Sequence, residues 1–155
     1  MARLSDLPEW ERPHHLDKIK ALPDYGPTPF APGPELARRR VSIVTTAGLH
    51  VRGDRPFEVG SSDYRVIPGD VASSDVVMSH ISVNYDRTGF QEDINVVFPL
   101  DRLRELEADG TIGSLSDFHY SFMGASQGHT LEGKARELAQ LLRRDGVDAV
   151  LLSPV

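Results

Sequence analysis

Residues 130–152, TLEGKARELAQLLRRDGVDAVLL, contain the pattern that decides the fold. Leucine and alanine recur in the first part with the 3.6-residue period of an amphipathic α-helix, and Thr130 is suited to capping its first turn. Gly146 is expected to end this helix. The near-continuous apolar run at 147–152 is typical of a strand buried on both faces of a parallel sheet. A strand, a helix and a second strand in this order form a βαβ unit.

Further elements are predicted upstream of this unit. The β-branched run VSIVTT at 41–46 indicates a buried strand, and turn residues bound the probable strands at 64–67 and 75–81. Pro99 is suited to the start of a helix that ends at Gly110. We therefore expect an α/β fold with an open, mainly parallel sheet and flanking helices, of the Rossmann-like or flavodoxin-like kind.

The beginning of the chain has a different composition. Seven of the eleven prolines lie within the first 34 residues. Because proline removes a backbone donor and restricts its neighbour, it disfavours helix and central strand, and a short helix is expected only over 16–21. We predict an extended Pro-rich arm at 1–40 and an α/β domain at 41–155. The arm is either a loosely attached terminus or a segment that wraps a partner subunit through its aromatic side chains.

Composition excludes several classes of protein. The 155 residues contain no cysteine, which removes disulfides, thiolate metal sites and cysteine nucleophiles. A net charge of −6 argues against general nucleic-acid binding. No apolar run approaches the roughly 20 residues of a membrane span, and no leader pattern is present, so a cytoplasmic location is expected. The sequence lacks a phosphate-binding glycine motif, and no nucleotide cofactor is indicated.

Three histidines and three other polar residues are the candidates for chemistry. They are His50, His80, His119, Asp86, Asp93 and Asn95. The histidines lie at or near predicted strand ends, where open α/β sheets bind ligands, and with a carboxylate they suit zinc or iron. Without a metal, His80 and His119 could act as acid–base groups, with Asp93 orienting them. The alternative is that Asp93 and Asn95 only build the turn before Val96.

The central and flanking segments resemble a known family. They are DINVVFPLDRLREL at 93–106, GTIG at 110–113, HYSFMG at 119–124, VTTAGLH at 44–50, RVIPGD at 65–70, Ser79-His80 and DGVDAVLL at 145–152. Together and in this order they are similar to the selenoprotein B family of glycine, sarcosine, betaine and D-proline reductases. The resemblance extends from about residue 41 to the end of the sequence.

The resemblance implies a redox function that these residues do not complete. In that family a selenocysteine or cysteine, paired with a second cysteine, follows the strand that matches 147–152 and works with a partner subunit holding a pyruvoyl group. Ser153, Pro154 and Val155 stand at that place here. The chain is then either a truncated reductase subunit or a naturally short member that uses the scaffold for chemistry without a redox group.

We favour the short member and expect a subunit of a small hetero-oligomeric enzyme. It would hydrolyse a small activated amide, ester or aryl ether with water activated by a metal or by a His/Asp base. A second protein subunit and a small-molecule substrate are the expected partners, with no nucleic acid or membrane. The alternatives are a truncated subunit of a glycine-, betaine- or D-proline-type reductase and a non-catalytic scaffold subunit.

Overall fold

The computed structural model describes residues 3–20, 22–24, 26–27, 31–82 and 86–155. The chain divides into two compact units, residues 1–31 and residues 32–155. The first unit contains a short turn of 3-10 helix, η1 (Leu4–Asp6), and the helix α1 (Arg12–Lys20). This helix is longer than the one expected at 16–21. Its second residue is Pro13, which the first turn of a helix tolerates because the missing N–H has no partner there.

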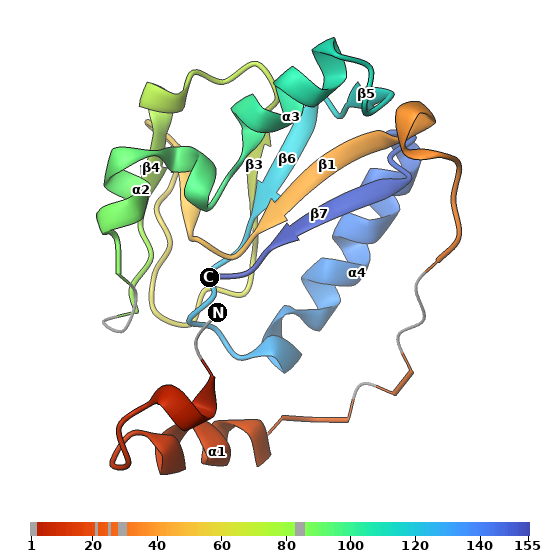
Figure 1. Cartoon of the computed structure of the whole chain (residues 1–155). Helices are drawn as coiled ribbons and strands as arrows, with labels where there is room; N and C mark the ends of the chain where they lie inside the picture. The colour runs from red at the N-terminus through yellow and green to blue at the C-terminus, as the bar shows by residue number, and fades with distance from the viewer. Residues whose placement is uncertain (1–2, 21, 25, 28–30, 83–85) are drawn as a thin grey trace. The chain divides into compact units, whose positions relative to one another are not determined.

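The second unit is built on a mainly parallel sheet around β1 (Arg40–Thr45) (Figure 1). Strand β1 pairs in parallel with β5 (Ser114–Leu115) near its start, with β6 (Phe118–Ser121) near its end, and with β7 (Ala149–Ser153) along most of its length. The one antiparallel partner in the described sheet is β3 (Arg65–Pro68), which pairs with β6. A mixed α/β fold with a mainly parallel sheet is therefore confirmed.

The remaining elements surround this sheet (Figure 1). They are η2 (Leu36–Arg38), β2 (Leu49–Val51), η3 (Ser73–Asp75), β4 (Val76–Met78), α2 (Thr88–Glu92), η4 (Ile94–Val96), α3 (Leu100–Ala108) and α4 (Gly128–Arg144). Strands β2 and β4 form a separate antiparallel pair. Helix α4 begins two residues before Thr130, whose hydroxyl donates to the carbonyl of Gln127 at 2.7 Å. No helix in the described ranges is both long and apolar enough to cross a membrane.

Two hydrophobic clusters lie on opposite faces of the sheet. Ile43 and Ile67 pack with Leu100 and Leu103 of α3 in the larger cluster. Tyr120 packs with α4 in the smaller cluster, whose other buried members are Phe122, Leu138, Leu142 and Val147. Successive strand residues point to opposite faces, so one sheet supplies both clusters.

Strand β7 differs from its prediction. Among the described strands, only β1 pairs with it, so β7 is an edge strand. Its apolar side chains are consequently exposed, with 41% of Val150, 38% of Leu151 and 69% of Leu152 accessible to solvent. The expectation of a strand buried on both faces is wrong because apolar composition does not reveal whether a second neighbour is present.

His119 is a polar residue inside the α3 face of the sheet. It is fully buried, and its Nδ1 accepts the backbone N–H of Ile43 at 3.0 Å, so Nδ1 carries no proton. The ring of Phe98 meets the imidazole edge-on at 5.8 Å between centroids. Burial, with smaller contributions from Arg104 and Arg40, lowers the pKa of His119 to about 4. The residue therefore stays neutral in the folded chain near neutral pH.

The depressed pKa of His119 predicts acid sensitivity. Between pH 6.5 and about 4 the unfolded chain binds a proton at His119 that the folded chain does not. The free energy of unfolding should therefore fall as pH is lowered through this window, by on the order of 3 kcal/mol. In His119→Asn the side-chain oxygen can still accept the Ile43 N–H but does not titrate. This variant should be less stable at pH 7, because the ring packing is lost. Its free energy of unfolding should nevertheless fall less than that of the natural chain as the pH is lowered.

Urea unfolding at stepped pH values measures both effects. His129→Asn is the matched control, because His129 is an exposed histidine at the start of α4. In this control the free energy of unfolding should fall on acidification by as much as in the natural chain. An unaltered acid decline in His119→Asn would contradict this role of His119.

Candidate functional site

The carboxyl ends of β1, β6 and β7 meet at one edge of the sheet, where Figure 1 places the C-terminus. Thr46, directly after β1, joins the segments that follow the other two strands. Its carbonyl accepts the N–H of Gly124 at 2.8 Å. Its hydroxyl accepts the N–H of Val155 at 2.8 Å and lies 3.3 Å from the Val155 carbonyl. The residues that follow β7 are thus fastened to this edge.

Gly124 is required at this edge because the backbones approach closely. A Cβ atom at Gly124 would lie 2.5 Å from the carbonyl oxygen of Val155 and 2.9 Å from that of Thr46. Both neighbours are backbone atoms, which cannot rotate away as a flexible side chain can. Any larger residue would push the terminal segment out of place.

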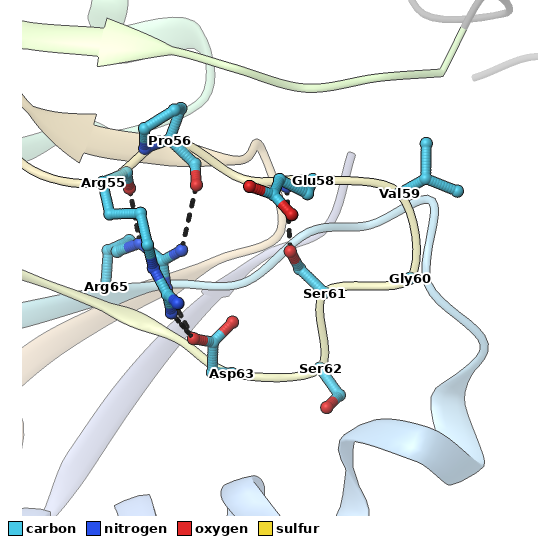
Figure 2. Close-up of a pocket in the computed structure, with 9 residues that line it drawn as sticks. All are labelled: Arg55, Pro56, Glu58, Val59, Gly60, Ser61, Ser62, Asp63 and Arg65. Carbon is cyan, nitrogen blue, oxygen red and sulfur yellow. Dashed lines mark hydrogen bonds and ion pairs between the residues drawn. The ribbon is translucent and has the colours of Figure 1, made fainter.

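A polar hollow of about 300 Å³ lies beside the same edge, in the loop between β2 and β3 (Figure 2). Its lining residues are Arg55, Pro56, Glu58, Val59, Gly60, Ser61, Ser62, Asp63 and Arg65. Arg65 pairs in register with Ser121, the last residue of β6. The hydroxyl of Ser126, in the loop before α4, donates to the carbonyl of Ser61 at 2.5 Å. These contacts place the hollow where open α/β sheets bind ligands.

Arg65 holds this loop in shape. Only 6% of its side chain is exposed, and it donates to the carbonyls of Arg55 at 2.7 Å and Pro56 at 3.1 Å. Its guanidinium also lies 4.3 Å from the ring centroid of Phe57 and 3.0 Å from the Asp63 carboxylate. Arg55 is 68% exposed and forms an ion pair with the same Asp63 oxygen. One carboxylate therefore bridges a buried arginine and an exposed one.

The three candidate histidines occupy different places. His80 follows β4, and its backbone lies 3.0 Å from the position that a Cβ of Gly48 would take, so it packs on the turn after β1. Burial, and secondarily Arg87, lowers the pKa of His80. The Nδ1 of His50 lies 3.1 Å from the carbonyl of Val51 on β2. His119 lies within β6, in the core.

Asp93 and Asn95 are bonded to one another before α3. One oxygen of Asp93 accepts the backbone and side-chain N–H groups of Asn95 at 2.9 and 2.8 Å, which lowers the pKa of Asp93. The side-chain oxygen of Asn95 accepts the N–H of Asp101 at 3.1 Å. Asp86 accepts the N–H of Thr88 at 2.9 Å, which lowers its pKa. These contacts fit the turn-building alternative, and a catalytic role for any of them stays a prediction.

The expectation of a metal-binding protein is corrected by this arrangement. Within the part of the chain that the structure describes, no group of three or more histidine, aspartate or glutamate side chains could hold a metal ion. The candidate set His50, His80 and His119 is divided among β2, the segment after β4, and the core of β6. Position near a predicted strand end does not determine where a side chain points.

Sequence reasoning did not name the residues that shape this edge as site residues. They are Thr46, Arg55, Asp63, Arg65 and Gly124. The available signal was a short segment in which two arginines flank a glycine, two serines and an aspartate, RPFEVGSSDYR at 55–65. Such a segment is also typical of an ordinary surface loop, and it predicted only a turn at 61–63 followed by a strand from residue 64.

Comparison with known proteins identifies the family. The family model described as glycine/sarcosine/betaine reductase selenoprotein B matches residues 26–155. The D-proline reductase subunit gamma of Acetoanaerobium sticklandii is 36% identical over 89% of this chain and 60% of its own length. The sarcosine reductase complex component B subunit beta of Peptoclostridium acidaminophilum is 35% identical over 77% of this chain and 28% of its own length. No solved structure matches.

The names of these relatives contradict the hydrolase function that was expected from the sequence, because all of them are reductase subunits. The glycine reductase complex component B subunit gamma of Symbiobacterium thermophilum, 31% identical over 81% of this chain and 30% of its own length, is likewise a reductase component. The chain spans about 60% of the first of these relatives and less than a third of the others. Their names describe subunits of multi-component enzymes. The chain belongs to the glycine/sarcosine/betaine reductase selenoprotein B family.

Proposed function

We propose that this chain works within a multi-component reductase that acts on a small amino acid or an N-methylated amino acid. Its family membership supports this proposal, as do the names of its relatives, which are subunits of D-proline, sarcosine and glycine reductases. The earlier alternative of a reductase subunit thus replaces the hydrolase.

The attachment of the segment after β7 carries the proposal. In the family pattern the redox residue follows the strand that matches 147–152. Here the segment after that strand is held at the carboxyl edge by Thr46, beside Gly124. A redox group near this position would face the ends of the parallel strands. The Rossmann-like or flavodoxin-like form of the sheet fits such a site and stays a prediction.

The reducing group itself must lie outside these residues. The 155-residue sequence contains no cysteine, so it has no thiol that could donate electrons to a substrate. We infer that a thiol or selenol on another polypeptide segment supplies them, with a pyruvoyl-bearing subunit as the partner that the resemblance implies. The scaffold in this chain would then position the substrate and the partner.

The exposed edge strand β7 is the surface we assign to the partner polypeptide. Unpaired edge strands invite pairing with another chain, and clustered exposed apolar side chains are typical of interfaces. Val150, Leu151 and Leu152 combine both properties. A partner packed there would also lie next to the segment at 153–155, where the redox chemistry is proposed.

A turnover assay tests the reductase assignment. The tagged full chain, purified from its own cells together with its bound partners, is incubated with a dithiol and with D-proline, glycine, sarcosine or betaine in turn. At least one substrate should disappear in a one-to-one ratio with oxidation of the dithiol. Failure of all four substrates, or loss of substrate without dithiol oxidation, would refute the reductase assignment.

Gly124→Ala should disable that complex. The added methyl group would collide with the carbonyls of Val155 and Thr46 and displace the segment after β7. We expect turnover to fall at least tenfold. Gly133→Ala is the matched control, because a Cβ at Gly133 meets nothing within 4 Å on α4 and alanine favours a helix by about 0.5–1 kcal/mol. The control should keep full turnover, and equal turnover in both variants would contradict the proposed position of the site.

Leu152→Ser should weaken partner binding without unfolding the chain. Leu152 is 69% exposed, so the folded chain loses little by the change, whereas an interface would lose a buried apolar side chain. Val96→Ser is the control, because Val96 is 64% exposed on η4, outside the sheet. Quantitative co-purification should show partner loss in the first variant only. Full retention of the partner by Leu152→Ser would exclude this surface.

A further inference from the structure

We propose that the hollow between β2 and β3 binds a small zwitterion of the α-amino acid class, free or N-methylated, through Arg55 and Glu58. Figure 2 shows Arg55, Asp63 and Arg65 on one side of the hollow, with Glu58 and Ser61 on the other. A cationic and an anionic side chain thus lie on opposite walls. The inference rests on the proposed function, because it gives the substrate of the reductase a place.

Arg55 supplies the recognition of a carboxylate. An arginine has five N–H donors in a planar fork that matches a carboxylate. Among the described residues, the Arg55 side chain uses one nitrogen, in its ion pair with Asp63. Arg65 cannot serve in the same way, because its donors are directed to Arg55, Pro56, Tyr64 and Asp63.

Glu58 supplies the recognition of the ammonium group. Its carboxylate makes no hydrogen bond or ion pair within the described ranges, although its backbone N–H donates to the Ser61 hydroxyl at 2.9 Å. The loop therefore fixes the Glu58 backbone and leaves the carboxylate available. Asp63 adds its second oxygen, since both arginines contact the other one.

The charge balance favours a zwitterion over an anion or a cation. Two arginines and two acidic residues line the hollow, so its formal charge is zero. A free anion would meet the carboxylate of Glu58 on the opposite wall, and a free cation would meet the exposed guanidinium of Arg55. A zwitterion can place its carboxylate against Arg55 and its ammonium group against Glu58 at the same time. Glycine, sarcosine, betaine and D-proline all have this form near neutral pH.

The position of the hollow connects it to the segment after β7. Ser126 bonds the Ser61 carbonyl on the wall of the hollow, and Gly124, two residues earlier, packs on Val155. One short loop thus contacts both the hollow and the place proposed for redox chemistry. This arrangement lets a bound amino acid lie beside the group that reduces it.

Binding to the purified full chain tests the inference. Each of the four amino acids is titrated while backbone amide signals are followed by NMR. Saturable shifts are expected at residues 55–65. The dissociation constant should rise at least tenfold in Arg55→Met and in Glu58→Gln. Acetate and methylammonium, which each carry one of the two charges, should bind more weakly than glycine. Absence of saturable binding by all four amino acids would overturn the inference.

Arg52→Met is the matched control. Arg52 is 66% exposed and lies three residues before Arg55, where it faces Asp75 at 3.9 Å outside the hollow. It should bind as the natural chain does, and equal affinity in Arg52→Met and Arg55→Met would also overturn the inference. Turnover of the complex separates the two proposals. If Arg55→Met keeps both turnover and KM, the hollow is not the substrate site, although the reductase assignment stands. If no complex reduces any substrate while Arg55-dependent binding persists, the reductase assignment falls and the binding site remains.

Discussion

The parallel pairing of β1 with three other strands is the constraint on which the second unit depends. Strand β1 meets β5 at its start, β6 at its end and β7 along its length, so it is enclosed on both edges and both faces. Residues 42 and 43 of β1 lie between the part that pairs with β5 and the part that pairs with β6. There, side chains make the hydrogen bonds that backbone pairing would otherwise make. Ser42 donates to the Phe118 carbonyl at 3.0 Å, and His119 accepts the Ile43 N–H. The burial of His119 follows from this junction, because a buried N–H needs an acceptor.

Parallel pairing also explains why the candidate site lies at one edge. Strands that run in the same direction bring their carboxyl ends together, although the residues that follow them are distant in sequence. At this edge the backbone is held rigidly by Thr46 and by the close approach at Gly124. In the neighbouring loop between β2 and β3, the buried Arg65 side chain holds the backbone by hydrogen bonds to the carbonyls of Arg55 and Pro56, while Arg55 and Glu58 stay exposed. A rigid base with available charged groups above it is what a binding site for a small polar molecule requires.

Sequence reasoning succeeded where the signal is local. The amphipathic period of α4, the β-branched run of β1 and the start of α3 after Pro99 each depend on a few neighbouring residues. It failed where a conclusion needed a distant contact. His119 was assigned to a ligand set, yet its imidazole completes the sheet beside Ile43. A catalytic role for Asp93 and Asn95 stays a prediction, and their contacts join them to each other and to Asp101. Arg55 carried no sequence signal stronger than that of a loop, and Arg65 was recognised only as part of a strand and of the segment RVIPGD.

The sequence by itself determined the α/β class and the family, and it excluded a thiol within these residues. Those properties follow from residue order and composition alone. The tertiary structure decided that β7 is an edge strand, that the histidines do not gather, and that an arginine and a glutamate face each other beside the strand ends. Each of these depends on which segments pair across 30 or more residues, as Val41 pairs with Ala149 and Arg65 with Ser121. Pairing partners set burial and proximity, and hydrophobic period cannot specify them.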